Sequence, residues 1–293
     1  MTPLQRCAVG ISSTIARLLR HVTRSLTLRW ACNAGMVAGL TLGLALAGHA
    51  SAAEACRGTL YLTFDTGSMS QARLIAETLR RHRIRATFFV ASEPTVQGDR
   101  SLDDGWAAYW KALAADGHAF GTHTFDHVYL VGEDGTDGIR VRPQFGPAAG
   151  QVQRWNQSAF CAELKRSATR FVALSGRPLD ALWRAPGGRT SPRTLAWAEQ
   201  CGFRHVGWDL AGFLGDELSS DRFPNARLLA QALERLKDGD IAMAHLGIWS
   251  RRDPWAPAVL EPLLTGLQAR GFCFATIPEH PRYQRASAPR SPR

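Results

Sequence analysis

Short apolar runs alternate along the chain with longer segments of helical periodicity. Six amphipathic segments predict helices, at 70–83, 104–116, 158–175, 191–201, 225–237 and 256–270. Seven runs rich in β-branched and aromatic residues predict strands, at 59–64, 85–91, 118–122, 181–184, 204–209, 240–245 and 272–276. This β/α alternation predicts a parallel sheet or barrel. Two polar stretches interrupt it, and we expect loops at 131–157 and 211–224.

The basic charge of the chain lies at its two ends. The formal net charge is +10, but residues 1–52 hold five Arg and residues 281–293 hold four, with no acid in either segment. The body between them keeps 26 of the 35 basic side chains against 25 acidic ones. A nearly neutral body excludes a strongly basic nucleic-acid-binding domain, so we expect no nucleic-acid partner.

The N-terminus has the features of an export signal. Basic residues precede an apolar run at 31–47, and Ala50-Ser51-Ala52 forms a small-residue cleavage pattern. We expect residues 1–52 to be a signal peptide, 53–280 the folded domain and 281–293 a disordered basic tail. We therefore expect an exported protein, either periplasmic or secreted. After cleavage it would keep no stable membrane span. The alternative is an uncleaved membrane anchor, for which the run is slightly short.

Four cysteines would remain after cleavage, and their number is even. In an oxidising compartment such a set is consistent with one or two disulfides, and four cysteines allow three full pairings. Four buried free thiols are the alternative. The absence of any Cys-x-x-Cys leaves a zinc ribbon or a thioredoxin-like motif unsupported. The four residues are Cys56, Cys161, Cys201 and Cys273.

Reactive side chains fall where the predicted strands end. Active sites of parallel α/β barrels are built at the C-terminal ends of their strands. We therefore expect these side chains to meet at one rim of the fold. They are Asp65, His123, His127, Arg184, Asp209 and His245.

Each local motif has a functional and a structural interpretation. His123 and His127 stand at i and i+4, so on a helical turn both imidazoles reach one ion; otherwise they are structural histidines. Asp65 is either a carboxylate in a cleft or a helix cap or Asx-turn. Arg184 either orients that carboxylate or forms an ordinary salt bridge. The Gly-rich turn around Gly187 has backbone N–H groups that can face an oxyanion.

Several of these segments resemble the motifs of the polysaccharide deacetylases, the NodB-homology or carbohydrate esterase 4 family. The similarity runs from about Thr59 to Ile277. It implies an α/β fold, a distorted (β/α)7-type barrel over the domain 53–280, and metal-assisted hydrolysis of an N-acetyl amide on a carbohydrate. The segments are 63–67 (TFDTG), 85–90 (RATFFV), 117–127 (GHAFGTHTFDH), 184–188 (RAPGG), 208–209 (WD) and 240–245 (DIAMAH).

The resemblance also implies roles for the rim residues. Asp65 would be the general base, held by Arg184, and His245 would protonate the departing amine. The Gly187 N–H would stabilise the oxyanion, and Asp209 would tune His245. The histidine pair would bind a divalent cation, with zinc preferred because imidazole ligands suit it better than magnesium or calcium. That pair is His123 and His127.

Thr66 departs from the family pattern, which has a metal-binding Asp at this position. A neutral hydroxyl is a much weaker ligand for a divalent cation than a carboxylate. The ion is then held by two His and water, by a replacement carboxylate, or not at all. The fourth motif also keeps only its first Asp, Asp209. Candidate replacement ligands are Asp126, Glu133, Asp134 and Asp137.

We therefore expect an exported carbohydrate N-deacetylase, a hydrolase of non-peptide carbon–nitrogen bonds. Two alternatives remain: a carbohydrate-binding pseudoenzyme with a degraded metal site, and a related amide hydrolase acting on a non-polymeric substrate. Nothing in the sequence fixes an oligomeric state. Aromatic residues near the rim either stack on sugar rings or pack in the core. They are Trp106, Tyr109, Trp110, Tyr129, Trp155, Trp249 and Trp255.

Overall fold

The computed structural model describes residues 55–284. The expected signal peptide lies outside the described residues, as does the tail from residue 285 onward. Residues 281–284 form a turn in which the Tyr283 ring lies 5.4 Å from the His280 ring, measured between centroids. This turn packs on the folded domain and extends it beyond the expected boundary at residue 280.

The seven predicted strands are all present and form one sheet of parallel pairs. Its order is β10-β1-β2-β3-β7-β8, and β9 also pairs with β1. The strands are β1 (Gly58–Asp65), β2 (Thr87–Val90), β3 (Ala119–Thr122), β7 (Leu182–Trp183), β8 (Arg204–His205), β9 (Ile241–His245) and β10 (Phe272–Phe274).

Irregular chain closes the sheet between β8 and β9. The segment that pairs with β7 through β8 continues to β9, where the Asp209 N–H donates to the Ile241 carbonyl at 3.1 Å. Further along, the Leu214 N–H donates to the Met243 carbonyl at 3.2 Å. One segment thus bridges two strands, which curls the sheet into an irregular ring. The predicted distorted (β/α)7-type barrel is confirmed.

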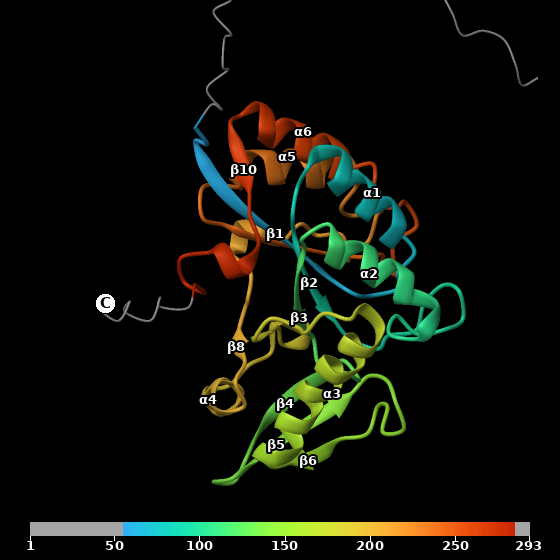
Figure 1. Cartoon of the computed structure of the whole chain (residues 1–293), viewed down its shortest axis with the longest axis vertical. Helices are drawn as coiled ribbons and strands as arrows, with labels where there is room; N and C mark the ends of the chain where they lie inside the picture. The colour runs from blue at the N-terminus through green and yellow to red at the C-terminus, as the bar shows by residue number, and fades with distance from the viewer. Residues whose placement is uncertain (1–54, 285–293) are drawn as a thin grey trace, which may run out of the picture. The chain divides into compact units, whose positions relative to one another are not determined.

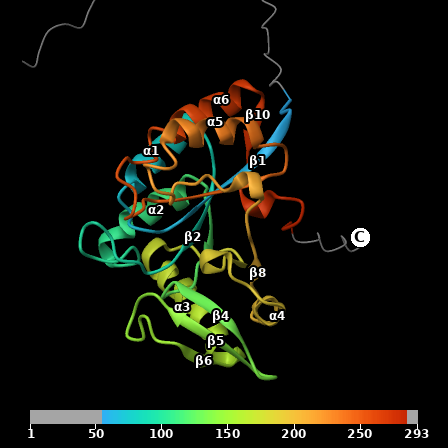
Figure 2. The ribbon, with the colours of Figure 1, turned by 180° about the vertical axis from the view of Figure 1, so that it is seen from behind.

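The six predicted helices are also present. In Figures 1 and 2, α6 lies beside both α5 and α1. Within residues 55–284, no helix is both long and apolar enough to cross a membrane. The helices are α1 (Ala72–His82), α2 (Ala107–Ala115), α3 (Gln157–Ser175), α4 (Pro192–Gln200), α5 (Asn225–Arg235) and α6 (Leu260–Ala269). Four short 3-10 turns accompany them, η1 (Asp104–Trp106), η2 (Pro186–Gly188), η3 (Leu210–Gly212) and η4 (Ile277–Glu279).

The expectation of a loop at 131–157 is wrong, because this stretch holds most of a three-stranded antiparallel sheet. Its middle strand alternates buried Ile139 and Val141 with exposed Arg140 and Arg142. The buried side packs against apolar residues of α3, which lies against the sheet in Figure 2. The strands are β4 (Val128–Asp134), β5 (Gly138–Pro143) and β6 (Gln153–Trp155). The second predicted loop, 211–224, holds the end of η3 and an isolated bridge from Phe213 to Met243.

Side-chain alternation along β1 places the site inside the barrel. Successive residues of a strand point to opposite faces of the sheet. One set, Leu60, Leu62 and Phe64, joins the large apolar cluster that includes the helices. The other set faces the barrel interior, where Tyr61 packs in a second cluster. This interior set comprises Tyr61, Thr63 and Asp65.

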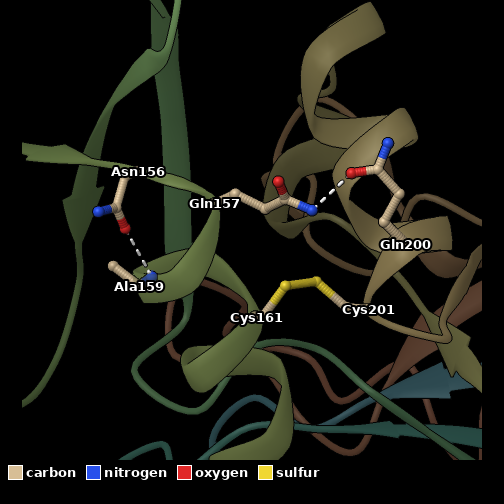
Figure 3. Close-up of a disulfide and its surroundings, with 6 residues drawn as sticks. All are labelled: Asn156, Gln157, Ala159, Cys161, Gln200 and Cys201. Carbon is tan, nitrogen blue, oxygen red and sulfur yellow. Dashed lines mark hydrogen bonds between the residues drawn. A yellow bond between two sulfur atoms is a disulfide. The ribbon is translucent and has the colours of Figure 1, made fainter.

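The four cysteines of the described residues form two disulfides, so the alternative of free thiols is excluded. One joins the chain before β1 to β10, and the other joins α3 to the end of α4. Figure 3 shows the second bridge, next to a 2.5 Å hydrogen bond from the Gln157 side chain to that of Gln200. The pairs are Cys56–Cys273 and Cys161–Cys201.

Candidate active site

Asp65 and Arg184 form a buried ion pair at the C-terminal ends of β1 and β7. Arg184 Nη1 donates to Asp65 Oδ1 at 2.9 Å and to Thr63 Oγ1 at 2.7 Å. Its remaining groups donate to the Val206 and Gly207 carbonyls, so the guanidinium is fixed on several sides. Burial opposes the Asp65 charge, but the Arg184 guanidinium, by its charge and its hydrogen bond, holds the pKa of Asp65 below its usual range. The carboxylate is therefore ionised at neutral pH.

His123 presents a lone pair to that carboxylate. Its Nδ1 lies 3.0 Å from the Arg184 carbonyl, and because a carbonyl only accepts, Nδ1 carries the hydrogen. Burial lowers the pKa of His123 to about 4, so the ring is neutral at neutral pH. The bare Nε2 then faces Asp65 Oδ2 at 3.6 Å. Two acceptors in such proximity favour a cation nearby.

His127 lies beside His123, with ring centroids 4.9 Å apart. Its Nδ1 is buried and has no hydrogen-bond partner among the described residues. The expected helical turn is wrong: Thr124 and His127 have positive φ values, 59° and 49°. This conformation is unfavourable for side chains other than glycine, most of all for a β-branched one. It is held by Val128, whose N–H donates to Thr124 Oγ1 at 2.7 Å.

Glu93 contacts Thr66, which stands where the sequence resemblance implies a metal-binding Asp. The Thr66 hydroxyl donates a short hydrogen bond to Glu93 Oε1, and the Gly67 N–H donates to the same oxygen at 2.9 Å. Glu93 follows the end of β2 and is 8% exposed. Burial opposes its charge, but the electrostatic interaction with the His127 ring and these two hydrogen bonds hold the pKa of Glu93 below its usual range.

The four candidate replacement carboxylates are all engaged elsewhere. Each forms an ion pair with an arginine on a neighbouring element, which satisfies its charge away from the histidine pair. The pairs are Asp126 with Arg166, Glu133 with Arg193, and Asp134 and Asp137 with Arg154.

The donor chemistry of the histidine pair fits a divalent cation. Two imidazoles are suitable zinc ligands, one with a bare Nε2 and the other with an unpartnered buried nitrogen. Within residues 55–284, no three His, Cys, Asp or Glu side chains are placed to coordinate one ion as they stand. Completing a site there requires side-chain rotation.

His245 ends β9 and is paired with Asp216. Its Nδ1 lies 3.1 Å from Asp216 Oδ1, and its backbone N–H donates to Oδ2 at 2.7 Å. Burial disfavours the charged ring, but Asp216, by charge and hydrogen bond, together with Asp65 and Glu217, raises the pKa of His245 to about 10. The ring is therefore an imidazolium at neutral pH.

Asp209 does not lie beside His245, contrary to the expectation that it would tune this histidine. Its carboxylate accepts the Ile241 N–H at 2.8 Å, and it lies 3.8 Å from Arg282. It therefore helps to attach the closing segment to β9. Asp216, seven residues further along, occupies the expected place beside His245.

The turn at Gly187 has a backbone conformation that favours glycine. Gly187 has φ +60°, and a Cβ there would lie 2.8 Å from the Tyr129 ring, so the turn requires glycine.

Only some of the aromatic residues considered for sugar contact lie near the site or at the surface. Trp255 is buried and lines a cavity of about 120 Å³ together with His245 and Asp216. Trp249 is 64% exposed. Trp106, Tyr109 and Trp110 are buried in the apolar core and cannot contact a sugar.

Sequence reasoning missed Glu93 and Asp216. Glu93 comes three residues after the end of β2, so the rule that collected residues at strand ends would have found it if applied to that strand. Asp216 lies in a polar stretch without regular structure, and only the return of this segment to β9 brings it to His245. No local signal marks it.

An ionised carboxylate and an imidazolium at the rim of a parallel α/β barrel are typical of a hydrolase that uses acid–base chemistry. The family model for polysaccharide deacetylases matches residues 52–206. The chain belongs to the polysaccharide deacetylase family.

Individual proteins are similar to this chain in sequence or in fold. A chitooligosaccharide deacetylase of Azorhizobium caulinodans is 26% identical over 245 residues, covering 80% of this chain and all of that protein. A family 4 acetyl xylan esterase from Clostridium thermocellum, solved with a cobalt ion, shares the fold with TM-score 0.56 at 19% identity, over 75% of this chain and 89% of that one. A pseudoenzyme of the same family from Bacillus anthracis has TM-score 0.55 at 16% identity, over 76% and 65%.

Proposed function

We propose that this protein is an exported, metal-assisted N-deacetylase of a carbohydrate that contains N-acetylated amino sugars. One observation carries the proposal. Asp65 and His245 are direct partners in the register of β1 and β9, and each is held in the charge state its role needs. The chitooligosaccharide deacetylase among the relatives supports the substrate class.

Asp65 acts as the general base. The carboxylate takes a proton from water, whose oxygen forms a bond to the acetyl carbonyl carbon. Arg184 keeps Asp65 ionised and oriented through the 2.9 Å hydrogen bond, since its other donors are fixed by carbonyls. Arg184 is thus a positioning residue, and the Gly187 N–H is the proposed donor to the oxyanion.

His245 acts as the general acid. An amine leaves only when it is protonated, so the carbon–nitrogen bond breaks as the imidazolium gives its proton to nitrogen. The products are acetate and a free amino sugar. Asp216 keeps the ring charged and fixes its orientation through Nδ1. The cavity of about 120 Å³ beside His245 is a place of suitable size for the acetyl group.

His123 and His127 would hold the divalent cation, with zinc preferred for imidazole ligands. When bound, the ion would polarise the acetyl carbonyl, a poor electrophile. The Arg184 carbonyl supports this role, because it fixes the hydrogen of His123 on Nδ1 and leaves Nε2 as the ligating atom.

Export is part of the proposal. The apolar run at 31–47, the Ala50-Ser51-Ala52 pattern and two disulfides in the described residues support it. N-terminal sequencing of protein recovered outside the cytoplasm should give a chain that begins near Ala53. A cytoplasmic chain that still begins at Met1 would contradict export.

Acetate release from N-acetylglucosamine oligomers tests the activity. The wild type should release acetate and leave free amines, and a chelator should reduce the rate. Acetylated xylan is the comparison substrate, because it distinguishes an O-deacetylase from an N-deacetylase. Binding to the oligomers without release of acetate would instead favour the pseudoenzyme.

A further inference from the structure

Position 66 and Glu93 share one hydrogen bond at the ends of β1 and β2. Thr66 is the residue that departs from the family's metal-binding carboxylate, and its hydroxyl donates to Glu93 Oε1. The carboxylate missing from one strand end is therefore present within contact distance, on the neighbouring strand end.

The backbone of Glu93 is firmly held. Its N–H donates to Ser101 Oγ at 3.0 Å, and its carbonyl accepts the Ser101 N–H at 2.9 Å. Oε1 of the carboxylate accepts from Thr66 and Gly67, whereas Oε2 has no hydrogen bond among the described residues. One oxygen thus anchors the carboxylate and the other remains available to a ligand.

Among the residues that the structure describes, Glu93 is also a buried carboxylate without a basic ion-pair partner. Within residues 55–284, no arginine or lysine forms an ion pair with it, and the rings of His127 and His123 are close enough to interact with it electrostatically. A buried carboxylate without a cationic partner is costly.

We propose that Glu93 is the third protein ligand of a divalent cation held by His123 and His127, replacing the carboxylate that Thr66 lacks. Thr66 and Gly67 orient this carboxylate through Oε1. The inference rests on the proposed function, because it completes the metal site of the same centre. Rotation of side chains must accompany binding, since no such trio is placed to coordinate an ion as it stands.

Zinc titration of chelator-stripped protein by calorimetry tests the ligand set. Glu93→Gln keeps the shape of the side chain and an oxygen for the Gly67 N–H, but removes the charge. Loss of even an outer-shell partner weakens metal binding 10–100-fold, so we expect a loss of at least about tenfold. Glu133→Gln is the control, because its carboxylate pairs with Arg193 and should not affect zinc affinity.

A carboxylate exchange sharpens the test. The double variant Thr66→Asp/Glu93→Gln moves the charge from β2 back to β1, and we expect it to recover most of the zinc affinity. Circular dichroism checks that each variant is folded. If Glu93→Gln alone does not fold, the double variant decides: zinc binding supports the exchange, and its absence overturns it.

Two results overturn the inference: wild-type zinc affinity in folded Glu93→Gln, or no zinc binding by the wild type. Acetate release by the wild type is measured separately. If zinc binding depends on Glu93 but the wild type releases no acetate, the proposed function is contradicted and the assignment of Glu93 as a zinc ligand stands. If the wild type releases acetate and the Glu93→Gln variant is fully active and binds zinc normally, the proposed function stands and the assignment of Glu93 as a ligand is contradicted.

Discussion

Asp65 and His245 occupy matching positions on neighbouring parallel strands, the last residue of β1 and the last of β9. An ionised carboxylate and an imidazolium are thereby fixed side by side by strand register rather than by loops. Asp65→Asn and His245→Ala should each lower kcat about a hundredfold or more, as expected for acid–base groups. Acetate release measures the effect, and circular dichroism confirms folding. Unchanged rates in both folded variants would contradict the roles.

The pH profile should depend on Asp216. The proposed role of general acid requires His245 to be protonated, and its pKa of about 10 keeps it so well above neutral pH. Asp216→Asn removes the largest charge that raises this pKa, so the alkaline limb of kcat should move toward neutral pH. Asp209→Asn is the matched control, because Asp209 binds the Ile241 N–H and not His245. Equal profiles for the two variants would show that Asp216 has no such influence.

Acid should destabilise the fold through His118. This residue is buried, and its Nδ1 accepts the Ala86 N–H at 3.0 Å. Burial lowers the pKa of His118 to about 4 from 6.5. Between these values the unfolded chain binds the proton and the folded chain does not, so the free energy of unfolding decreases as the pH falls from about 6.5 toward 4.

Urea denaturation at several pH values measures this dependence. His118→Asn keeps an acceptor for the Ala86 N–H but does not titrate, so its stability should fall less steeply with acid. The difference in slope should reach at most about 1.4 kcal/mol per pH unit. Parallel curves for the wild type and the variant would exclude His118 as a source of acid sensitivity.

The disulfide between α3 and α4 should stabilise the domain. Replacing both Cys161 and Cys201 by Ser should lower the free energy of unfolding by roughly 2–4 kcal/mol, as for typical disulfides. Denaturation without reductant measures the loss. The matched variant replaces Cys56 and Cys273. These two residues are 217 positions apart, whereas Cys161 and Cys201 are 40 apart, so the chain-entropy model predicts at least as large a loss of stability. Wild-type stability in both variants would contradict this.

The sequence was sufficient for the barrel because its strands are distinct apolar runs bounded by helices with clear periodicity. The three-stranded sheet was missed for a physical reason. In β5, apolar residues alternate with arginines over only six positions, GIRVRP, and glycines and prolines surround it. Such a segment gains its strand conformation from packing on α3, which local periodicity does not show.

For the site, residues that end strong strands were found and residues positioned by distant contacts were not. Asp65 and His245 follow from strand ends alone. The partner of His245 depends on how the chain closes the curled sheet between β8 and β9. The sequence resemblance therefore predicts Asp209 beside His245, whereas Asp216 makes the contact. Likewise, Glu93 reaches Thr66 only because β1 and β2 are adjacent in the sheet.

The bridge between Cys56 and Cys273 determines how the domain responds to mechanical force. Once a pull on the chain loads these two residues, the sulfur–sulfur bond transmits it directly from one to the other. The 217-residue span between them is shielded from extension. Likewise, a single protease cut within that span leaves one covalently connected molecule, so cleavage of a surface loop does not separate the two halves of the barrel.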